Sequence, residues 1–542
     1  MPLGSKNSDD WSQRLKGAAE LHRKGDLAAA ERLYLQLLDA RPDRPDVLYS
    51  LGVLRRQQGR FPEALSSIGG ALKKSPKFLA ALFEHAVVLQ ALDRPGEAVA
   101  SYDKALAIKP DCLEALYNRG NALRELNRNA GALASYDKAL AIKPNFPEAL
   151  NNRGNSLRDL GRAAEALSSY DQALAVKPIY AEALNNRGTA LRELNRAAEA
   201  IASFDKALTI KPAYAEALYN RGNALRDLNR AAEALASFDQ ALAINPCDAG
   251  ALYSRGNALQ DMERGAEALA SYDKALAINP GLAEAWFDRG VVLQGLKRPE
   301  EAVAAYRQAL AKGGDAEVIQ FALASLGAEA APVMAPKKFV AELFDQCADR
   351  FEGRLVGKLK YQAPDLLFDL VGRFVSSGKL DILDLGCGTG LAGARVHPFA
   401  RTLTGVDLSS NMLKIARQRQ IYDDLICGEL VEFLGTRPKS FDMAIATDVF
   451  IYIGDLSRVF HGVRGALRDG GLFGFSVEAS EEKDFVLRST CRYAHSVTYL
   501  RKLAESHQFY VEAIESMVIR QQDGSDVVGY LAVLRSSLGC VC

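Results

Sequence analysis

Apolar residues recur with the period of amphipathic helices through more than half of the chain, and the whole pattern repeats every 34 residues. From Trp11 to Ala316 the sequence divides into nine such units without an insertion. Each unit contains two amphipathic stretches, and in the first eight units, from Pro42 to Pro280, a proline follows the second stretch. Proline ends a helix because it lacks the N–H donor and clashes with the preceding turn. The pattern therefore predicts nine helix-turn-helix pairs.

Small residues occupy two positions in every unit, one in each predicted helix. The first position is glycine in seven units and alanine in two, and the second is alanine in all nine. Small side chains let the helices cross closely, and a large side chain four residues after the second position fills the gap between neighbouring units. In period, order and positions the pattern resembles the tetratricopeptide repeat (TPR). The resemblance implies an all-α superhelix whose concave wall, lined by the first helices, holds a partner protein or peptide.

Asparagine recurs at two positions, three residues apart, on this expected concave wall. That spacing places each pair on one face of a helix, and an amide that both donates and accepts suits a peptide backbone. The alternative is a polar, solvated face that was copied with the repeats and has no ligand. The candidate partner-binding residues are Asn118, Asn121, Asn152, Asn155, Asn186, Asn220, Asn223 and Asn257.

The periodicity stops after the ninth unit. Residues 317–327 are apolar enough for a capping helix, and 328–338, rich in alanine and proline, predict a linker. From 339 to 542, short apolar runs alternate with amphipathic stretches, which is typical of an α/β domain with a parallel sheet. At the other end, residues 1–10 are interpreted as tag-like and disordered.

A glycine-rich turn follows the first apolar run of the α/β region. Leu380–Leu385 predicts a buried strand, and Gly386-Cys-Gly-Thr-Gly390 comes directly after it. Such a turn lets the backbone approach a ligand closely. The dinucleotide fingerprint requires glycine where Leu391 stands, and the lysine of a phosphate-binding loop is absent. The run from Asp384, D-L-G-C-G-T-G, instead resembles the first motif of class I S-adenosylmethionine-dependent methyltransferases.

Later landmarks follow the order of that family. Asp407 ends the second predicted strand, where an acid accepts hydrogen bonds from both ribose hydroxyls. The stretch from Phe344 to Phe351 resembles the helix that covers the cofactor in small-molecule methyltransferases, and Tyr361 is expected either to close over the cofactor or to pack in the core. The resemblance assigns S-adenosylmethionine, with S-adenosylhomocysteine as product, to Asp384, Gly386, Cys387, Gly388, Gly390, Asp407, Leu408, Met412, Gly428, Glu429, Leu430, Thr447, Asp448 and Tyr361.

The whole chain resembles bacterial predicted methyltransferases that carry TPRs. The resemblance implies an all-α TPR superhelix of nine repeats followed by an α/β Rossmann-like class I methyltransferase domain. His495 is the candidate base or substrate contact, although a lone histidine is more often structural, and Tyr452 is the candidate wall of the acceptor pocket. Glu478 and Arg492 either pair with each other or hold a polar substrate.

Composition removes several other classes of function. Lysine plus arginine equals aspartate plus glutamate at 67 each, so we expect no nucleic-acid binding. No run of eighteen apolar residues and no signal peptide is visible, which predicts a cytoplasmic protein without membrane contact. The eight cysteines form no C-x-x-C pair, which disfavours a metal site.

Three hypotheses remain. The favoured one is methyl transfer to a small or carrier-bound metabolite, with the repeats recruiting a protein partner. The second is a protein methyltransferase whose substrate is held by the repeat groove. The third is a scaffold that binds S-adenosylmethionine without turnover. The sequence leaves the methyl acceptor, the partner, the oligomeric state and the need for a base open.

Overall fold

A computed structural model describes residues 5–348, 351–353, 360–375, 378–482, 484–522 and 525–538. The chain divides into two compact units after Arg264, between the two helices of the eighth repeat. Among the helices in these ranges, none combines the length and the apolar composition that a bilayer crossing requires.

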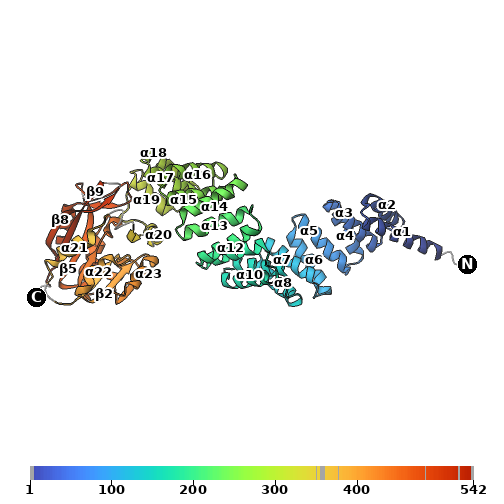
Figure 1. The fold of residues 1–542 in the computed structure, drawn as a ribbon, viewed down its shortest axis with the longest axis horizontal. Coiled ribbons are helices and arrows are strands. Elements are labelled where there is room, and N and C mark those ends of the chain that lie inside the picture. The colour runs from blue at the N-terminus through green and yellow to red at the C-terminus, as the bar shows by residue number, and fades with distance from the viewer. Residues whose placement is uncertain are drawn as a thin grey trace. The chain divides into compact units, whose positions relative to one another are not determined.

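The first unit consists of helices that pack as antiparallel pairs in chain order (Figure 1). The first helix begins at Ser5, so residues 5–10, which we expected to be disordered, are helical, whereas residues 1–4 lie outside the described ranges. The helices are α1 (Ser5–Arg23), α2 (Leu27–Ala40), α3 (Pro45–Gln57), α4 (Phe61–Lys74), α5 (Leu79–Ala91), α6 (Pro95–Ile108), α7 (Leu113–Glu125), α8 (Asn129–Ile142), α9 (Pro147–Asp159), α10 (Ala163–Val176), α11 (Ala181–Glu193), α12 (Ala197–Ile210), α13 (Ala215–Asp227), α14 (Ala231–Ile244) and α15 (Ala249–Asp261).

The glycine in the first helix of a repeat makes room for the aromatic ring in the second. A Cβ atom added to Gly120 would lie 2.5 Å from Cε1 of Tyr136, and the same distance separates the corresponding atoms of Gly154 and Tyr170. Both tyrosine side chains are fully buried. Tyr136 also packs in one cluster with Val99 of the preceding repeat. The ring therefore fills space both within its own repeat and against the neighbouring one.

The second unit begins with the remaining helices of the repeat region, α16 (Gly265–Ile278), α17 (Ala283–Gly295), α18 (Pro299–Ala311) and α19 (Ala316–Ser325). We expected α19 as a cap on the last repeat. Its Phe321 is buried and lies 5.2 Å from the ring of Phe339 and 6.3 Å from that of Tyr493, measured between ring centroids. One face of α19 is therefore buried against the α/β domain.

The segment expected to be a linker to residue 338 joins the α/β domain earlier than that. Met334 forms an antiparallel bridge with Ile453, and the Ala335 N–H donates to the Tyr452 carbonyl at 2.8 Å. The next helix, α20 (Lys337–Cys347), begins directly afterwards. The last residues of the expected linker are thus hydrogen-bonded into the α/β domain.

One mixed sheet forms the centre of the α/β domain. Its order is β3-β2-β1-β4-β5-β7-β6, with β9 antiparallel to β5 and β8 antiparallel to β9. The five strands β3, β2, β1, β4 and β5 run parallel to one another, and the order reverses between β1 and β4. The strands are β1 (Leu380–Leu385), β2 (Ala400–Asp407), β3 (Asp424–Cys427), β4 (Phe441–Ala446), β5 (Leu467–Ala479), β6 (Phe485–Leu487), β7 (Tyr493–His495), β8 (Phe509–Gln522) and β9 (Ser525–Ser536).

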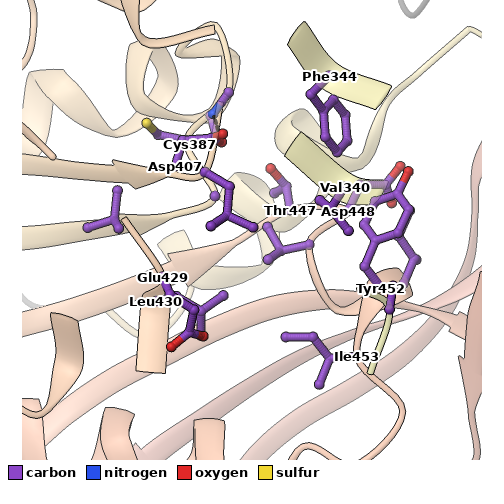
Figure 2. A pocket seen from close by; sticks show the side chains of 18 of the residues that line it. Val340, Phe344, Cys387, Asp407, Glu429, Leu430, Thr447, Asp448, Tyr452 and Ile453 are labelled. Atoms are coloured by element: carbon purple, nitrogen blue, oxygen red, sulfur yellow. Dashed lines mark hydrogen bonds between the residues drawn. The ribbon is translucent and has the colours of Figure 1, made fainter. Parts of the chain in front are cut away.

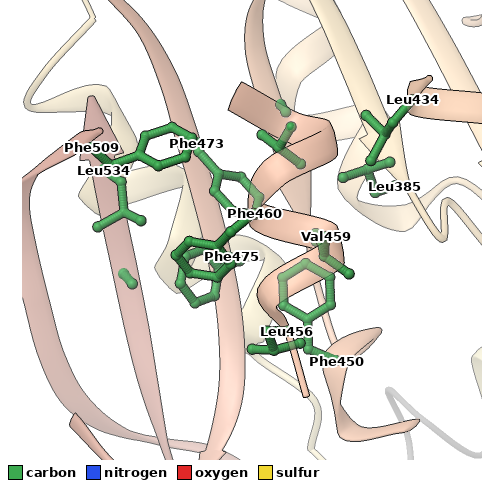
Figure 3. Packing of buried hydrophobic residues seen from close by; sticks show 14 of the residues in the cluster. Leu385, Leu434, Phe450, Leu456, Val459, Phe460, Phe473, Phe475, Phe509 and Leu534 are labelled. Atoms are coloured by element: carbon green, nitrogen blue, oxygen red, sulfur yellow. The ribbon is translucent and has the colours of Figure 1, made fainter. Parts of the chain in front are cut away.

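Helices cover this sheet and enclose an aromatic core. Phe460 packs against the rings of both Phe473 and Phe475, at 5.6 and 5.7 Å between centroids, and Phe450 lies 5.5 Å from Phe475 (Figure 3). All four side chains are fully buried, and their edge-to-face or tilted contacts fix the helix that carries Phe460 and the short 3-10 helix that carries Phe450 against β5. The covering elements are α21 (Ala363–Gly372), α22 (Leu391–Val396), η3 (His397–Phe399), α23 (Ser410–Gln418), α24 (Leu430–Leu434), η4 (Phe450–Tyr452), α25 (Ser457–Ala466) and α26 (Val497–Ser506).

Candidate functional site

A pocket opens where the parallel strands β1 to β4 end, beside the point at which the strand order reverses. In open α/β sheets this is the usual place for a ligand. Two chemically different sides face each other across it (Figure 2). The first, which we call the glycine-turn side, is lined by Gly386, Cys387, Gly388, Asp407, Leu408, Gly428, Glu429 and Leu430. The second, the α20 side, is lined by Met334, Ala335, Val340, Phe344, Tyr361, Ile451, Tyr452, Ile453 and Arg492.

The turn after β1 adopts a backbone that favours glycine. Gly386, Gly388 and Gly390 have φ angles of 63°, 54° and 89°, in the left-handed region where a side chain is strained. A Cβ atom on Gly386 would lie 2.4 Å from Cγ2 of Val449, whereas one on Gly388 would meet nothing within 4 Å. The turn therefore leaves open space directly above Gly388. Gly390, an expected cofactor contact, is not among the residues that line the pocket.

Asp407 holds the turn in place from the end of β2. Its carboxylate accepts hydrogen bonds from the backbone N–H groups of Gly388 and Ser409, each at 2.8 Å. Burial raises the pKa of the Asp407 carboxyl, while these two N–H donors lower it. A carboxylate offers about four lone-pair sites. The carboxylate, which lines the pocket, therefore keeps acceptor capacity for hydroxyl donors.

Asp384 and Met412 lie under the pocket instead of lining it. Asp384 is buried within β1 and accepts a hydrogen bond from the Tyr422 hydroxyl at 2.7 Å. Burial raises the pKa of Asp384 to about 7, and its Oδ1 has no partner among the described residues. Met412 is fully buried in α23. Both were expected to contact cofactor, and the structure gives both a place in the supporting layer.

Glu429 shapes the lower edge of the glycine-turn side. It precedes α24, and its carboxylate accepts hydrogen bonds from the N–H groups of Val431 and Glu432 at 3.0 and 2.9 Å. It therefore caps this helix. Its neighbour Leu430 supplies an apolar surface beside the cap in Figure 2.

The α20 side is apolar and aromatic. The rings of Phe344 and Tyr452 meet edge-on at 5.6 Å, and Phe351 lies 5.8 Å from Phe344. Asp345 of the same helix accepts hydrogen bonds from the Ser409 hydroxyl at 2.5 Å and the Asn411 N–H at 3.2 Å. The expected lid helix is thus tied to the loop after β2. Asp349 and Arg350, which belong to the lid motif, lie outside the described residues.

A buried guanidinium anchors the back of the pocket. Arg520 of β8 is 1% exposed, donates to Asp448 Oδ2 at 2.7 Å and pairs with Glu478. Asp448 lines the pocket with Thr447, and its backbone has a φ of 56°. Arg492, which we expected either to pair with Glu478 or to hold a polar substrate, lies within ion-pair distance of Glu478, at 3.9 Å. The closest ion pair of Glu478 is therefore with Arg520, a partner that the sequence did not suggest.

His495, the candidate base, is not in the pocket. Its ring is fully buried, and Nε2 lies 2.9 and 3.0 Å from the carbonyl oxygens of Ile453 and Gly454. Because both partners only accept, Nε2 carries the proton. Burial lowers the pKa of His495 to about 4, so the ring is neutral at physiological pH. The structure places His495 as a support for the segment after η4, and Tyr452 as the candidate that does line the pocket.

Comparison with known families identifies both parts of the chain. Residues 383–475 match a family described as a methyltransferase domain. Repeat families match residues 16–77, 79–112, 120–157, 151–215, 222–263 and 248–312. The chain joins TPRs to a class I methyltransferase domain.

Curated relatives of the methyltransferase domain are themselves named as methyltransferases. A probable S-adenosylmethionine-dependent methyltransferase of Saccharomyces cerevisiae is 28% identical over 169 residues, 29% of this chain and 57% of its own. The ubiquinone biosynthesis O-methyltransferase of Idiomarina loihiensis is 27% identical over 150 residues, 27% of this chain and 60% of its own. This chain therefore spans less than two thirds of either relative. On the repeat side, a TPR protein from Parabacteroides merdae is 21% identical with a TM-score of 0.37, covering 46% of this chain and 99% of its own.

The glycine-turn side of the methyltransferase domain has the features that S-adenosylmethionine requires. Asp407 keeps free lone pairs for ribose hydroxyls, Gly388 leaves room for a close approach, and Asp448 Oδ1 is buried without a partner among the described residues. When bound, S-adenosylmethionine supplies an electrophilic methyl carbon on a sulfonium. The residues that would hold it are Gly386, Cys387, Gly388, Asp407, Leu408, Gly428, Glu429 and Leu430 of the glycine-turn side, Thr447 and Asp448 after β4, and Tyr361 of the α20 side.

Several pocket residues had no signal in the sequence. Met334 and Ala335 come from the alanine- and proline-rich segment, and Val340 precedes the recognised lid motif. The Ala335–Tyr452 backbone hydrogen bond brings the first two to the pocket. Met334 and Ala335 line the pocket only because their segment pairs with a segment that is distant in the sequence.

The asparagines of the repeats form hydrogen bonds among themselves and with the packed tyrosines. Asn121 Oδ1 accepts from the Tyr136 hydroxyl at 2.7 Å and from Asn152 Nδ2 at 3.0 Å. Asn186 and Asn220 each donate at 3.0 Å to a buried asparagine one repeat earlier, Asn151 and Asn185. These amides thus stabilise the junctions between repeats. The candidates Asn118, Asn121, Asn152, Asn155, Asn186, Asn220 and Asn257 remain partly exposed, and Asn223 is buried.

Proposed function

We propose that the methyltransferase domain transfers a methyl group from S-adenosylmethionine to a small or carrier-bound acceptor. The observation that carries the proposal is the two-sided pocket at the end of β1 to β4. One side offers a carboxylate and an open glycine turn for the donor, and the other offers an apolar wall for an acceptor. In-line methyl transfer mainly requires that the two reactants be aligned and shielded from water.

The α20 side supports a small acceptor more than an exposed protein side chain. The rings of Phe344 and Tyr452 pack edge to face, and the ring of Phe351 lies 5.8 Å from that of Phe344. A compact acceptor fits between this aromatic wall and the glycine turn. An acceptor on a carrier protein could enter on its flexible arm.

A protein acceptor is the second candidate, and one observation favours it. Gln294 of α17, in the last repeat, donates to the Ser489 carbonyl at 2.6 Å and accepts from the Tyr306 hydroxyl at 2.6 Å. Ser489 lies three residues before the pocket residue Arg492. The last repeat therefore contacts the strand connection that carries part of the α20 side.

Incubation with methyl-labelled S-adenosylmethionine and host lysate separates these functions. We expect label in the small-molecule filtrate, or in protein precipitate from which hydrolysis of a carrier thioester releases it. Label held stably in protein would indicate the second candidate. Asp407→Ala should remove the label in each case, and cofactor binding without any label would indicate a non-catalytic scaffold.

We also propose that the repeats recruit a protein partner through the asparagine ladder. Replacing Asn152, Asn186 and Asn220 with alanine should abolish partner capture while binding of S-adenosylmethionine persists. A matched control replaces Gln172 and Gln240, exposed on the second helices of their repeats, with alanine. Equal capture by the triple variant and the control would show that the ladder serves only the packing of the repeats.

A further inference from the structure

One position near the end of the first helix of a repeat carries a side chain that bonds to the following repeat. In the sixth repeat this side chain is Arg192, which pairs at 2.6 Å with Asp227, 35 residues ahead. In the third repeat it is Gln90, whose Nε2 donates to Glu125 at 3.3 Å, again 35 residues ahead. The Oε1 atom of Gln90 also accepts from the Tyr102 hydroxyl at 2.8 Å. The position therefore links consecutive repeats.

Gln294 occupies this position in the ninth repeat, and one of its partners lies in the α/β domain. Its Oε1 accepts from the Tyr306 hydroxyl at 2.6 Å, as the glutamine of the third repeat does from its own tyrosine. Its Nε2 donates to the Ser489 carbonyl at 2.6 Å and to Ser325 Oγ at 3.2 Å. Ser489 belongs to the connection between β6 and β7. The amide that links two repeats in the third repeat thus links the ninth repeat to the α/β domain.

Phe321 of α19 stands at a second repeated position, 34 residues after Phe287. The ring of Phe287 packs on Tyr306 of the second helix of its repeat, at 5.5 Å between centroids, and the third, fourth and seventh repeats have the same contact. Phe321 instead packs on Phe339 of α20 at 5.2 Å and on Tyr493 of β7 at 6.3 Å. α19 therefore presents to the α/β domain the ring that these repeats present to their own second helix.

The apolar cluster around Phe321 extends to the α20 side of the pocket. Phe321, Tyr452 and Tyr493 are buried members of this cluster, and Val340 and Phe344 pack against it. Three of these residues, Val340, Phe344 and Tyr452, line the pocket (Figure 2). The helix that caps the repeats and the aromatic wall of the pocket thus share one core.

We propose that Gln294 and Phe321 are positioning residues of the methyltransferase, which hold the α20 side through the β6–β7 connection and the shared core. The last repeat and its cap are then part of the enzyme. The proposal rests on the proposed methyl transfer, with the α20 side as the acceptor wall. Because in-line transfer depends on the alignment of the two reactants, a displaced wall impairs the use of the acceptor. The strand-end loops that would hold the cofactor stay in place.

The same substitution in two repeats of the full-length protein tests this role. Gln294→Ala removes the link to Ser489, and Gln90→Ala removes the corresponding amide and its tyrosine hydrogen bond from the third repeat. Methyl-labelled S-adenosylmethionine and a dilution series of host lysate give the maximal rate and the half-saturating amount of lysate. Gln294→Ala should raise that amount about fivefold, the effect of one hydrogen bond, with the affinity for S-adenosylhomocysteine unchanged. Gln90→Ala should match the wild type in both.

Hydrogen exchange reports the position of the wall without an acceptor. The Arg488 N–H is hydrogen-bonded within the β6–β7 connection, and the Ala335 N–H donates to a carbonyl of η4. Both should exchange about fivefold faster in Gln294→Ala and in Phe321→Leu, because local opening becomes easier. The Gly388 N–H of the glycine turn should keep its rate.

The outcomes separate this proposal from the function on which it rests. A wild type that does not bind S-adenosylhomocysteine, or that binds it and transfers no label, would overturn the methyl transfer and the positioning role together. If label is transferred, equal half-saturating amounts for Gln294→Ala and the wild type would overturn the positioning role alone. Equal losses in Gln294→Ala and Gln90→Ala, or an unchanged exchange rate at Ala335, would overturn it as well.

Discussion

The two sides of the pocket differ in how they are built. The glycine-turn side is a set of short loops at consecutive strand ends, held by side-chain-to-backbone hydrogen bonds such as those of Asp407 and Glu429. The α20 side combines segments that are far apart in the chain, including Met334, Tyr452 and Arg492. It is held by aromatic contacts and by the Arg520 network.

This difference suggests a division of labour. Backbone turns fixed by strand ends suit a ligand of constant shape, such as a nucleoside. A wall of side chains from separate segments can change one residue at a time, and a different acceptor needs only a few such changes. The variants below test whether the two sides act separately, and they run from the largest expected effect to the smallest.

Among these variants, Gly386→Ala should cause the largest loss, which is in the stability of the glycine-turn side. The new Cβ would lie 2.4 Å from Val449 Cγ2 at a φ of 63°. Backbone strain and overpacking together cost roughly 2–5 kcal/mol, which lowers the calorimetric melting temperature of the methyltransferase domain by roughly 5–15 °C. Gly388→Ala is the control, because its Cβ meets nothing within 4 Å. Equal losses for both would contradict the close packing of Gly386 on Val449.

Asp407→Ala should weaken the binding of S-adenosylmethionine by one to two orders of magnitude, about 1.4–3 kcal/mol for a charged hydrogen-bonding partner. Thermal protection by saturating cofactor reports this loss, because protection depends on the ratio of ligand concentration to Kd. Asp424→Ala, on the exposed start of β3, is the control and should keep the full protection. Full protection of both variants would exclude a ribose contact at Asp407.

His495→Gln should alter the pH dependence of stability and leave catalysis in place. The folded pKa of about 4 lies below the ordinary value of 6.5, so the unfolded chain binds the proton first and stability falls as pH falls from about 6.5 towards 4. Lowering the pH from 7 to 5 therefore reduces the free energy of unfolding by about 2 kcal/mol through His495. Urea unfolding at the two pH values should show a smaller loss for the variant. A large fall in turnover at pH 7, with the fold intact, would restore His495 as a candidate base.

Tyr452→Phe should affect the α20 side alone. It removes one hydroxyl beside Arg492 and keeps the ring that packs on Phe344. We expect about a fivefold loss in kcat/KM, near 1 kcal/mol for a single hydrogen bond, with cofactor affinity unchanged. Tyr530→Phe, on β9 outside the pocket, is the matched control. A change in cofactor affinity would show that Tyr452 belongs to both sides.

The same division explains what could be predicted from the sequence. The repeats and the glycine-turn side follow from local patterns, because a 34-residue period and a D-L-G-C-G-T-G run are visible within short windows. The class of fold and the glycine-turn side of the pocket, with Gly388 and Asp407, could therefore be predicted. Asp384 was assigned to the cofactor because it starts the motif, although the structure buries it against Tyr422.

The α20 side depends on contacts across long stretches of chain. Arg520 lies 72 residues from Asp448 and reaches it through the antiparallel strand β8. Met334 stands in a segment without strand periodicity and becomes part of the pocket through its bridge with Ile453. His495 looked reactive because nothing in the sequence indicates that two carbonyl groups enclose its ring.

Side-by-side calorimetric titration of S-adenosylmethionine into the wild type, Asp407→Ala and Tyr452→Phe tests the two-sided pocket most directly. We predict binding to the wild type, a 10- to 100-fold weaker affinity for Asp407→Ala and an unchanged affinity for Tyr452→Phe. Absence of binding to the wild type, or equal affinity for all three proteins, would contradict a donor site on the glycine-turn side.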